Sequence, residues 1–214
     1  MTNSEILSHV DHTLLKPFAT WEQIQTLCDE AVQYKCASVC IPASYIKAIK
    51  EKYQDNLEIC TVVGFPLGYE TTAGKVADAI QCIADGATEI DMVVNIAEIK
   101  NGNYEYVEEE IKALRKATEG YTLKVIIETC YLSDEEKIEL CKIVTRAGAD
   151  YIKTSTGFGT AGATIEDIKL FKENIGKDVK MKAAGGITTI DEVKEYLEIG
   201  CDRIGTSRAV ALLK

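Results

Sequence analysis

Histidine and basic charge are both scarce in this sequence. Only two histidines occur in 214 residues, and His9 and His12 have no third ligand at a suitable spacing, so the sequence predicts no metal site. Lysine and arginine total 24 against 34 aspartates and glutamates, which leaves a formal net charge of −10. Because nucleic-acid backbones require clustered basic side chains, this balance argues against a nucleic-acid partner. A small anionic ligand is not excluded, since it responds only to the local potential.

Long apolar runs and secretion signals are also missing. No stretch of 18 apolar residues occurs, so we expect no membrane-spanning helix and no membrane partner. Residues 1–5 contain neither the basic segment nor the apolar segment that begins a signal peptide. The eight cysteines include no C-x-x-C pair, and most lie in apolar segments. We therefore expect them to be reduced in a cytoplasmic protein, with Cys40 as a buried apolar residue.

Helix and strand signals alternate along the chain. Residue pairs of the capping-box type predict helix starts, and glycines that precede a short strand predict helix ends. The predicted starts are at Thr20, Ser133 and Thr189, with further signals at Thr71 or Thr72, Asn103 and Thr164, and the glycines are Gly86, Gly148 and Gly200. Strands that alternate with helices in this way predict a parallel sheet.

Eight segments have the character of short strands. They lie near residues 10–14, 38–41, 58–64, 89–94, 123–129, 151–154, 179–184 and 203–206. Eight βα units in about 200 residues suit a (β/α)8 barrel, or TIM barrel, and we expect a short helical extension at its N-terminus. An open doubly wound sheet is the alternative, but no predicted strand is followed by a G-x-G-x-x-G turn. Only three prolines and no linker-like tract occur, so residues 1–214 are expected to form one catalytic domain.

Ionisable side chains occupy strand positions that should face the barrel axis. Ile90 and Met92 share the face that should pack on helices, which leaves Asp91 on the inner face. The same alternation turns Lys153 and Lys182 inward, toward the carboxyl ends of their strands, where barrel enzymes keep their active sites. A buried salt-bridge network would account for these residues without any function. Three such groups would be costly to bury at one barrel mouth, however, and a lysine beside another cation is a candidate nucleophile toward a carbonyl.

Three glycine-rich segments follow strands around the same mouth. They are Thr156–Gly159, Ala184–Ile187 and Ile204–Ser207. Backbone N–H groups of such loops commonly bind a phosphate in barrel enzymes. Ordinary tight turns also require glycine, so one such loop alone is weak support. Their convergence beside two inward lysines predicts a phosphate pocket.

At these residues the sequence resembles the deoxyribose-phosphate aldolase family. The matching segments are spread in the family's order over nearly the whole chain, and the two lysine motifs together are highly specific. The segments are Asp11–Leu15, Val63–Gly68, Glu89–Asn95, Lys124–Thr129, Tyr151–Phe158, Lys182–Ile187 and Arg203–Ser207.

The resemblance implies a class I aldolase without metal or other cofactor. Its substrate would be 2-deoxy-D-ribose 5-phosphate, cleaved reversibly to acetaldehyde and D-glyceraldehyde 3-phosphate in deoxyribose phosphate catabolism. Lys153 is implied to form the Schiff base, Lys182 to favour the neutral amine of Lys153 and help to move protons, and Asp91 to act as general acid and base through water. The implied phosphate contacts are Gly157, Gly185, Gly186, Gly205 and Ser207. Phe158 stands where some members of the family carry a lysine, so that side-chain contact is absent here.

Two other classes of function stay open at this stage. One is another phosphate-binding barrel, either a different Schiff-base aldolase or a sugar-phosphate isomerase, which would not need Lys153 as a covalent group. The other is a non-catalytic sugar-phosphate binding module, which has no use for three inward ionisable groups. The sequence does not give the oligomeric state, and a homodimer is compatible with it.

Overall fold

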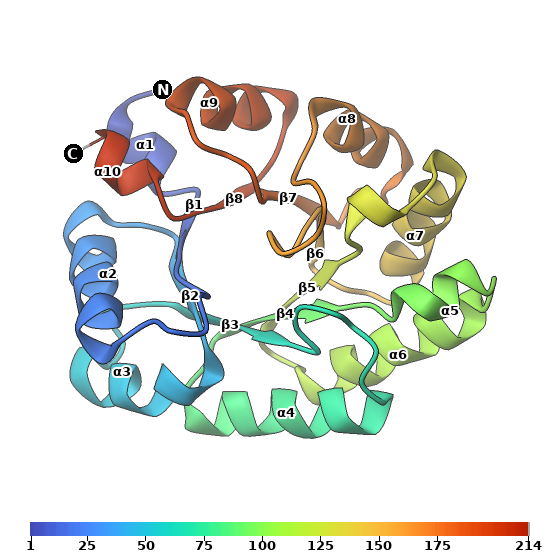
Figure 1. Ribbon diagram of the computed structural model, residues 1–214, viewed down its shortest axis with the longest axis horizontal. Coiled ribbons are helices and arrows are strands. Elements are labelled where there is room, and N and C mark those ends of the chain that lie inside the picture. Colours follow the sequence, from blue (N-terminus) through green and yellow to red (C-terminus); the bar gives the residue numbers. More distant parts are fainter. Residues whose placement is uncertain (214) are drawn as a thin grey trace.

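The strands form a closed parallel barrel in the computed structural model, which describes residues 1–213. Each strand pairs with the next along the chain, and β1 also pairs with β8, with Asp11 opposite Gly205. The predicted (β/α)8 barrel is therefore confirmed, and the open-sheet alternative is wrong (Figure 1). The strands are β1 (Val10–Thr13), β2 (Ser38–Ile41), β3 (Ile59–Val63), β4 (Glu89–Val93), β5 (Thr122–Ile126), β6 (Tyr151–Lys153), β7 (Lys180–Ala184) and β8 (Arg203–Thr206).

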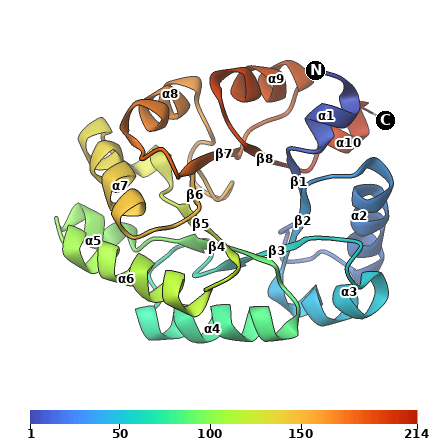
Figure 2. The same cartoon turned by 180° about the vertical axis from the view of Figure 1, so that it is seen from behind.

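Helices surround the barrel on the outside, as Figures 1 and 2 show from its two ends. The predicted helical extension at the N-terminus is confirmed as α1 (Asn3–Leu7). The other α-helices are α2 (Trp21–Tyr34), α3 (Ile46–Tyr53), α4 (Thr72–Asp85), α5 (Ile96–Lys100), α6 (Tyr104–Ala117), α7 (Asp134–Arg146), α8 (Ile165–Asn174), α9 (Ile190–Ile199) and α10 (Ala209–Leu213), and short 3-10 helices are η1 (Ala43–Tyr45) and η2 (Thr129–Tyr131). No helix within residues 1–213 is long and apolar enough to cross a membrane.

Local capping explains where the helices begin. The side chains of Thr20, Ser133 and Thr189 each accept a hydrogen bond from the backbone three residues on, and the reciprocal capping-box bond is present in each case. Thr71, and not Thr72, caps α4 by accepting from Gly74 N. Asn103 precedes α6 without a side-chain cap bond.

The two faces of the strands differ as the alternation predicts. On β4, Ile90 and Met92 belong to the apolar cluster beneath the helices, whereas Glu89 and Asp91 are buried inside the barrel. The layer between the strands and the helices is thus hydrophobic, and most of the apolar surface of the protein is buried there. The interior of the barrel is instead rich in charged side chains.

Four predicted strands end one residue earlier than predicted, and a fifth ends three residues earlier. The strand near residues 123–129 ends at Ile126, although Ile127 N still donates to Lys153 O at 3.1 Å. Glu128 then adopts a φ of 53°, in the left-handed region, and the chain turns into η2. This turn lies beside the carboxyl end of β6, next to the predicted active site.

Candidate active site

The three residues predicted to face the barrel axis meet at one carboxylate oxygen. Asp91 comes from β4, Lys153 from β6 and Lys182 from β7, where Lys153 and Lys182 are register partners. The Nζ atom of Lys153 and that of Lys182 each donate to Asp91 Oδ2 at 2.7 Å. Asp91 and Lys182 are fully buried, and Lys153 is 3% exposed. Their predicted convergence is confirmed.

A third buried lysine, which the sequence argument missed, completes this group. Lys124 lies opposite Asp91 in the pairing of β4 with β5, and its Nζ donates to Asp91 Oδ1 at 2.9 Å. The same ammonium contacts Glu89 and lies 3.3 Å from Cys60 Sγ. The alternation that turned Lys153 inward applies equally to Lys124, so the signal was present in the sequence.

The ionic contacts continue toward the opposite end of the barrel. Asp11 Oδ2 lies 2.5 Å from Lys182 Nζ, and Asp11 Oδ1 accepts from Arg203 Nη1. Arg203 Nη1 also donates to Glu89 Oε2 at 3.0 Å. We call the seven side chains of this cluster the ionic interior: Asp11, Glu89, Asp91, Lys124, Lys153, Lys182 and Arg203. The salt-bridge network considered from the sequence therefore exists, and it includes the predicted site.

Neighbouring charges set the ionisation of the two most buried site residues. Burial disfavours the charged form of Asp91, but the ammonium groups of Lys124, Lys153 and Lys182 outweigh it and hold the pKa of Asp91 well below its usual value. Burial also disfavours the charge of Lys182, but the carboxylates of Asp11 and Asp91 raise the pKa of Lys182 above its usual value. Asp91 is therefore a carboxylate and Lys182 an ammonium at neutral pH.

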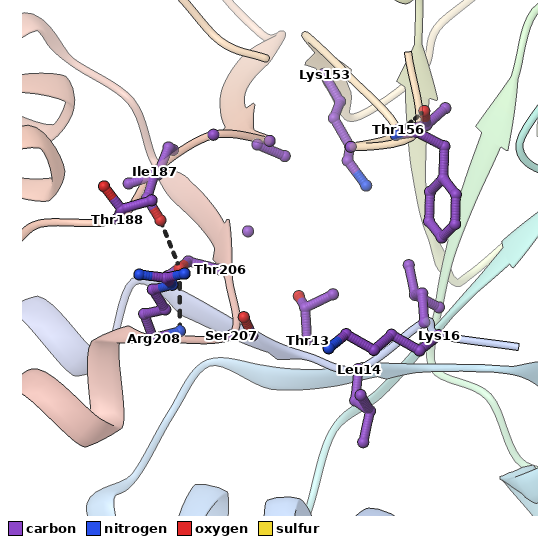
Figure 3. Close-up of a pocket in the computed structure, with 17 residues that line it drawn as sticks. Thr13, Leu14, Lys16, Lys153, Thr156, Ile187, Thr188, Thr206, Ser207 and Arg208 are labelled. Carbon is purple, nitrogen blue, oxygen red and sulfur yellow. Dashed lines mark hydrogen bonds between the residues drawn. The ribbon is translucent and has the colours of Figure 1, made fainter. Parts of the chain in front are cut away.

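A cavity of about 400 Å³ opens at the carboxyl ends of the strands, above this group (Figure 3). Lys153 lines it, whereas Asp91 and Lys182 lie below its wall. All five residues predicted as phosphate contacts also line it: Gly157, Gly185, Gly186, Gly205 and Ser207. The glycine-rich segments and the inward lysine are thus brought to one cavity.

The cavity wall also contains cations that the sequence argument missed. Lys16, from the segment after β1, and Arg208, after β8, both line the cavity. In Figure 3 they lie across the cavity from Lys153. They give an anionic ligand a local positive potential within an acidic chain. Neither residue lies in a periodic segment, so no pattern of the sequence singled them out.

The packing of the turns requires glycine in the cavity wall. Gly185 has a φ of 81°, and a Cβ atom built on it would lie 3.1 Å from Gly162 Cα and 3.4 Å from Gly157 Cα. Any larger residue would push these turns apart. The close approach of the turns therefore accounts for glycine at this position, whether or not a phosphate binds there.

Two thiols lie beneath the cavity. Cys40 is 1% exposed, as expected for a buried cysteine. It lies within β2, opposite Cys60 of β3. Cys40, Cys60 and Asp91 form one of two buried groups within residues 1–213 whose donor atoms are close enough to hold a metal ion. The ammonium of Lys124 already contacts both Cys60 and Asp91 in that group.

Comparison with known proteins identifies the family. The model of the DeoC/LacD family aldolases matches residues 6–207. The deoxyribose-phosphate aldolase of Clostridium botulinum (strain Alaska E43 / Type E3) is 63% identical over 214 residues, which cover 100% of this chain and 97% of the relative. That of Clostridioides difficile (strain 630) is 56% identical over 209 residues, which cover 98% of this chain and 95% of the relative.

A solved structure agrees with these relatives. The tetrameric deoxyribose phosphate aldolase of Aeropyrum pernix has a TM-score of 0.92 at 31% sequence identity, covering 99% of this chain and 91% of that one. The resemblance seen in the sequence motifs is thereby confirmed. Matched at these identities and over nearly its whole length, the chain belongs to the DeoC/LacD family of aldolases.

Proposed function

We propose that this chain cleaves 2-deoxy-D-ribose 5-phosphate reversibly to acetaldehyde and D-glyceraldehyde 3-phosphate through a Schiff base on Lys153. One observation carries the proposal. Lys153 belongs to the ionic interior and also lines the cavity, whereas Lys124 and Lys182 are fully buried beneath it. Lys153 is therefore the lysine of this group that a substrate can reach. The names of the relatives support the choice of substrate.

The chemistry follows from an amine that attacks an aldehyde. Neutral Lys153 adds to C1 of the open-chain sugar, and loss of water gives an iminium ion. A base then removes the proton of the C3 hydroxyl, the C2–C3 bond breaks, and its electron pair moves into the iminium as glyceraldehyde phosphate leaves. The resulting enamine is protonated at C2, and water hydrolyses the imine to release acetaldehyde and restore the amine.

Asp91 and Lys182 are proposed to serve the proton transfers. Asp91 shares one oxygen between Lys153 and Lys182 at 2.7 Å each, so it can orient the nucleophile and balance the charge of the iminium. Because Asp91 is ionised at rest, its proposed role as general acid and base begins as a base, through a water molecule. Lys182 places a second positive charge at the same oxygen and can carry a proton.

The anionic end of the substrate is proposed to lie against the glycine turns. The backbone at Gly157, Gly185, Gly186 and Gly205 and the Ser207 hydroxyl are the proposed contacts. Lys16 and Arg208 add the charge that glycines cannot supply. Binding the remote phosphate helps to hold the reacting carbons beside Lys153.

One experiment separates this function from its rivals. Acetaldehyde release from deoxyribose 5-phosphate is followed, and the enzyme is then treated with acetaldehyde and borohydride and mapped by peptide mass. An isomerase or a binding module would release no aldehyde, and a label on Lys182 would contradict the assignment of the nucleophile. Lys153→Ala is expected to lower kcat at least about 1000-fold. Lys180→Ala, on the solvent-exposed end of β7, is the matched lysine control.

We further propose that residues 1–214 act as one catalytic domain and that the enzyme serves deoxyribonucleotide catabolism in the cytoplasm. All eight cysteines are free, which supports a reducing compartment. A homodimer is compatible with the sequence, and sedimentation velocity tests it: a single species of twice the monomer mass would support it, and any other mass would contradict it.

A further inference from the structure

The turn after β5 holds a buried carboxyl group that the proposed reaction does not use. Glu128 is 2% exposed and has a φ of 53°, a left-handed conformation that residues other than glycine and asparagine rarely adopt. Burial raises the pKa of Glu128 above its usual value. Unfavourable backbone and unfavourable burial at one residue beside an active site indicate a local requirement for this side chain.

The carboxyl group of Glu128 holds the segment that follows the nucleophile. Its Oε1 atom accepts from Thr156 N at 3.1 Å, and its Oε2 atom accepts from the Thr156 hydroxyl. Thr156 Oγ1 accepts in turn from Phe158 N at 3.0 Å. A Cβ atom built on Gly159 would lie 3.1 Å from the carboxyl carbon of Glu128, so the segment also lies in contact with this group. One side chain of the β5 turn thus fixes the backbone after β6.

The held segment forms one wall of the cavity. Thr156, Gly157 and Phe158 line it together with Lys153, and the Gly157 backbone packs against Gly185. Glu128 itself does not line the cavity. It therefore acts on a bound molecule only through the position of Thr156–Phe158 relative to the turn at Gly185.

We propose that Glu128 is a positioning residue whose carboxyl group places the Thr156–Phe158 turn so that the cavity accepts the phosphate of the substrate. This inference rests on the proposed function. It predicts an outcome that a purely structural role would not produce: loss of Glu128 affects recognition of the phosphate more than the chemistry at Lys153.

The test compares phosphorylated and unphosphorylated sugar. For Glu128→Ala, KM for deoxyribose 5-phosphate is expected to rise about tenfold or more, because the turn loses the two hydrogen bonds that hold it, while kcat/KM for deoxyribose changes by about twofold at most. Glu128→Gln keeps one acceptor and is expected to lie between Glu128→Ala and wild type. Because glutamine has nearly the same shape as glutamate, the Gln variant can be used for the comparison of the two sugars if the Ala variant does not fold.

Glu110→Ala is the matched control. Glu110 is another buried carboxyl group, 1% exposed, on α6 and away from the cavity wall. Its loss should lower the melting temperature without changing the preference for the phosphorylated sugar. If Glu128 variants lower kcat/KM for both sugars by the same factor, as Glu110→Ala would through partial unfolding, the positioning role is wrong.

Binding of inorganic phosphate, measured by calorimetry, separates this inference from the proposed function. Phosphate should bind the Glu128→Ala variant about tenfold more weakly than wild type, whether or not the protein cleaves deoxyribose phosphate. A wild-type protein that releases no acetaldehyde but shows this difference would contradict the proposed function and support the role of Glu128. Equal phosphate affinities in wild type and variant would overturn the role of Glu128.

Discussion

The buried ion pair between Lys75 of α4 and Glu110 of α6 offers a quantitative test of what stabilises the fold. Both side chains are fully buried, and Lys75 Nζ lies 2.9 Å from Glu110 Oε2. The same ammonium donates to Gly68 O at 2.7 Å and to Val93 O at 2.8 Å, so its three hydrogens all have acceptors. Lys75 thereby joins the helices to the loop after β3 and to the end of β4.

Replacing Lys75 by methionine keeps the apolar part of the side chain and removes the charge. Glu110 would then be a buried carboxyl group with only the hydrogen bonds from Asn95 N and Thr72 Oγ1, both at 3.3 Å. Breaking a buried ion pair in this way costs about 3–5 kcal/mol, a large part of a total stability of roughly 5–15 kcal/mol. With a urea m value of about 3 kcal/mol/M, the unfolding midpoint should fall by at least about 1 M.

The double variant Lys75→Met/Glu110→Leu should recover most of this loss. Burial lowers the pKa of Lys75 and raises the pKa of Glu110, in each case against the attraction of the partner. Burial thus outweighs the attraction, and an apolar pair of similar volume should be stable to within about 1 kcal/mol of wild type. Urea unfolding of the wild type, both single variants and the double variant forms the cycle. A double variant that loses the sum of the two single losses would refute this reasoning.

Three further outcomes follow from the site. Neighbouring charges hold the pKa values of Asp11 and Asp91 below their usual 3.8. The stability that these carboxylates contribute is therefore fully present above 3.8 and is lost as the pH falls from there through the lower pKa values of the folded state, so the urea midpoint should drop steadily below that pH. A flat profile would mean that the unfolded chain keeps these contacts. Gly186→Val should raise KM for the phosphorylated sugar by about tenfold or more, whereas Gly102→Val, with a similar positive φ and nothing within 4 Å, should leave KM unchanged; equal effects would point to backbone strain alone. Dialysis against a chelator should leave acetaldehyde release unchanged. If the chelator abolished the activity and added Zn²⁺ restored it, the enzyme would be a metal-dependent aldolase instead.

The parts of the site that lie on regular strands could be predicted from the sequence. Strand alternation placed Asp91, Lys153 and Lys182 on the inner face because apolar residues mark the outer face of β4, β6 and β7. Lys124 obeys the same alternation, but apolar residues occupy both faces of its strand, with Ile126 opposite Lys153 inside and Val125 outside. The alternation there is blurred, and Lys124 was missed.

The residues that the sequence could not reveal lie in loops or act across long separations. Lys16 and Arg208 line the cavity from segments without periodicity. The contact between Asp11 and Arg203 joins residues 192 positions apart and depends on closure of the barrel. Glu128 adopts a left-handed conformation, which cannot be predicted from the sequence because glutamate, unlike glycine and asparagine, does not favour it.

The ionic interior also restricts how this protein can change over generations. Asp91 contacts three lysines, and Lys124 and Arg203 each contact two carboxylates or more. Most single replacements among them leave an uncompensated charge inside the barrel, at a cost that is a large part of the stability of the fold. A lineage can therefore alter this interior only by several substitutions at once, whereas an exposed side chain of the cavity rim such as Phe158 can change on its own. Changes of substrate should therefore arise in the loops, while the residues of the ionic interior stay unchanged.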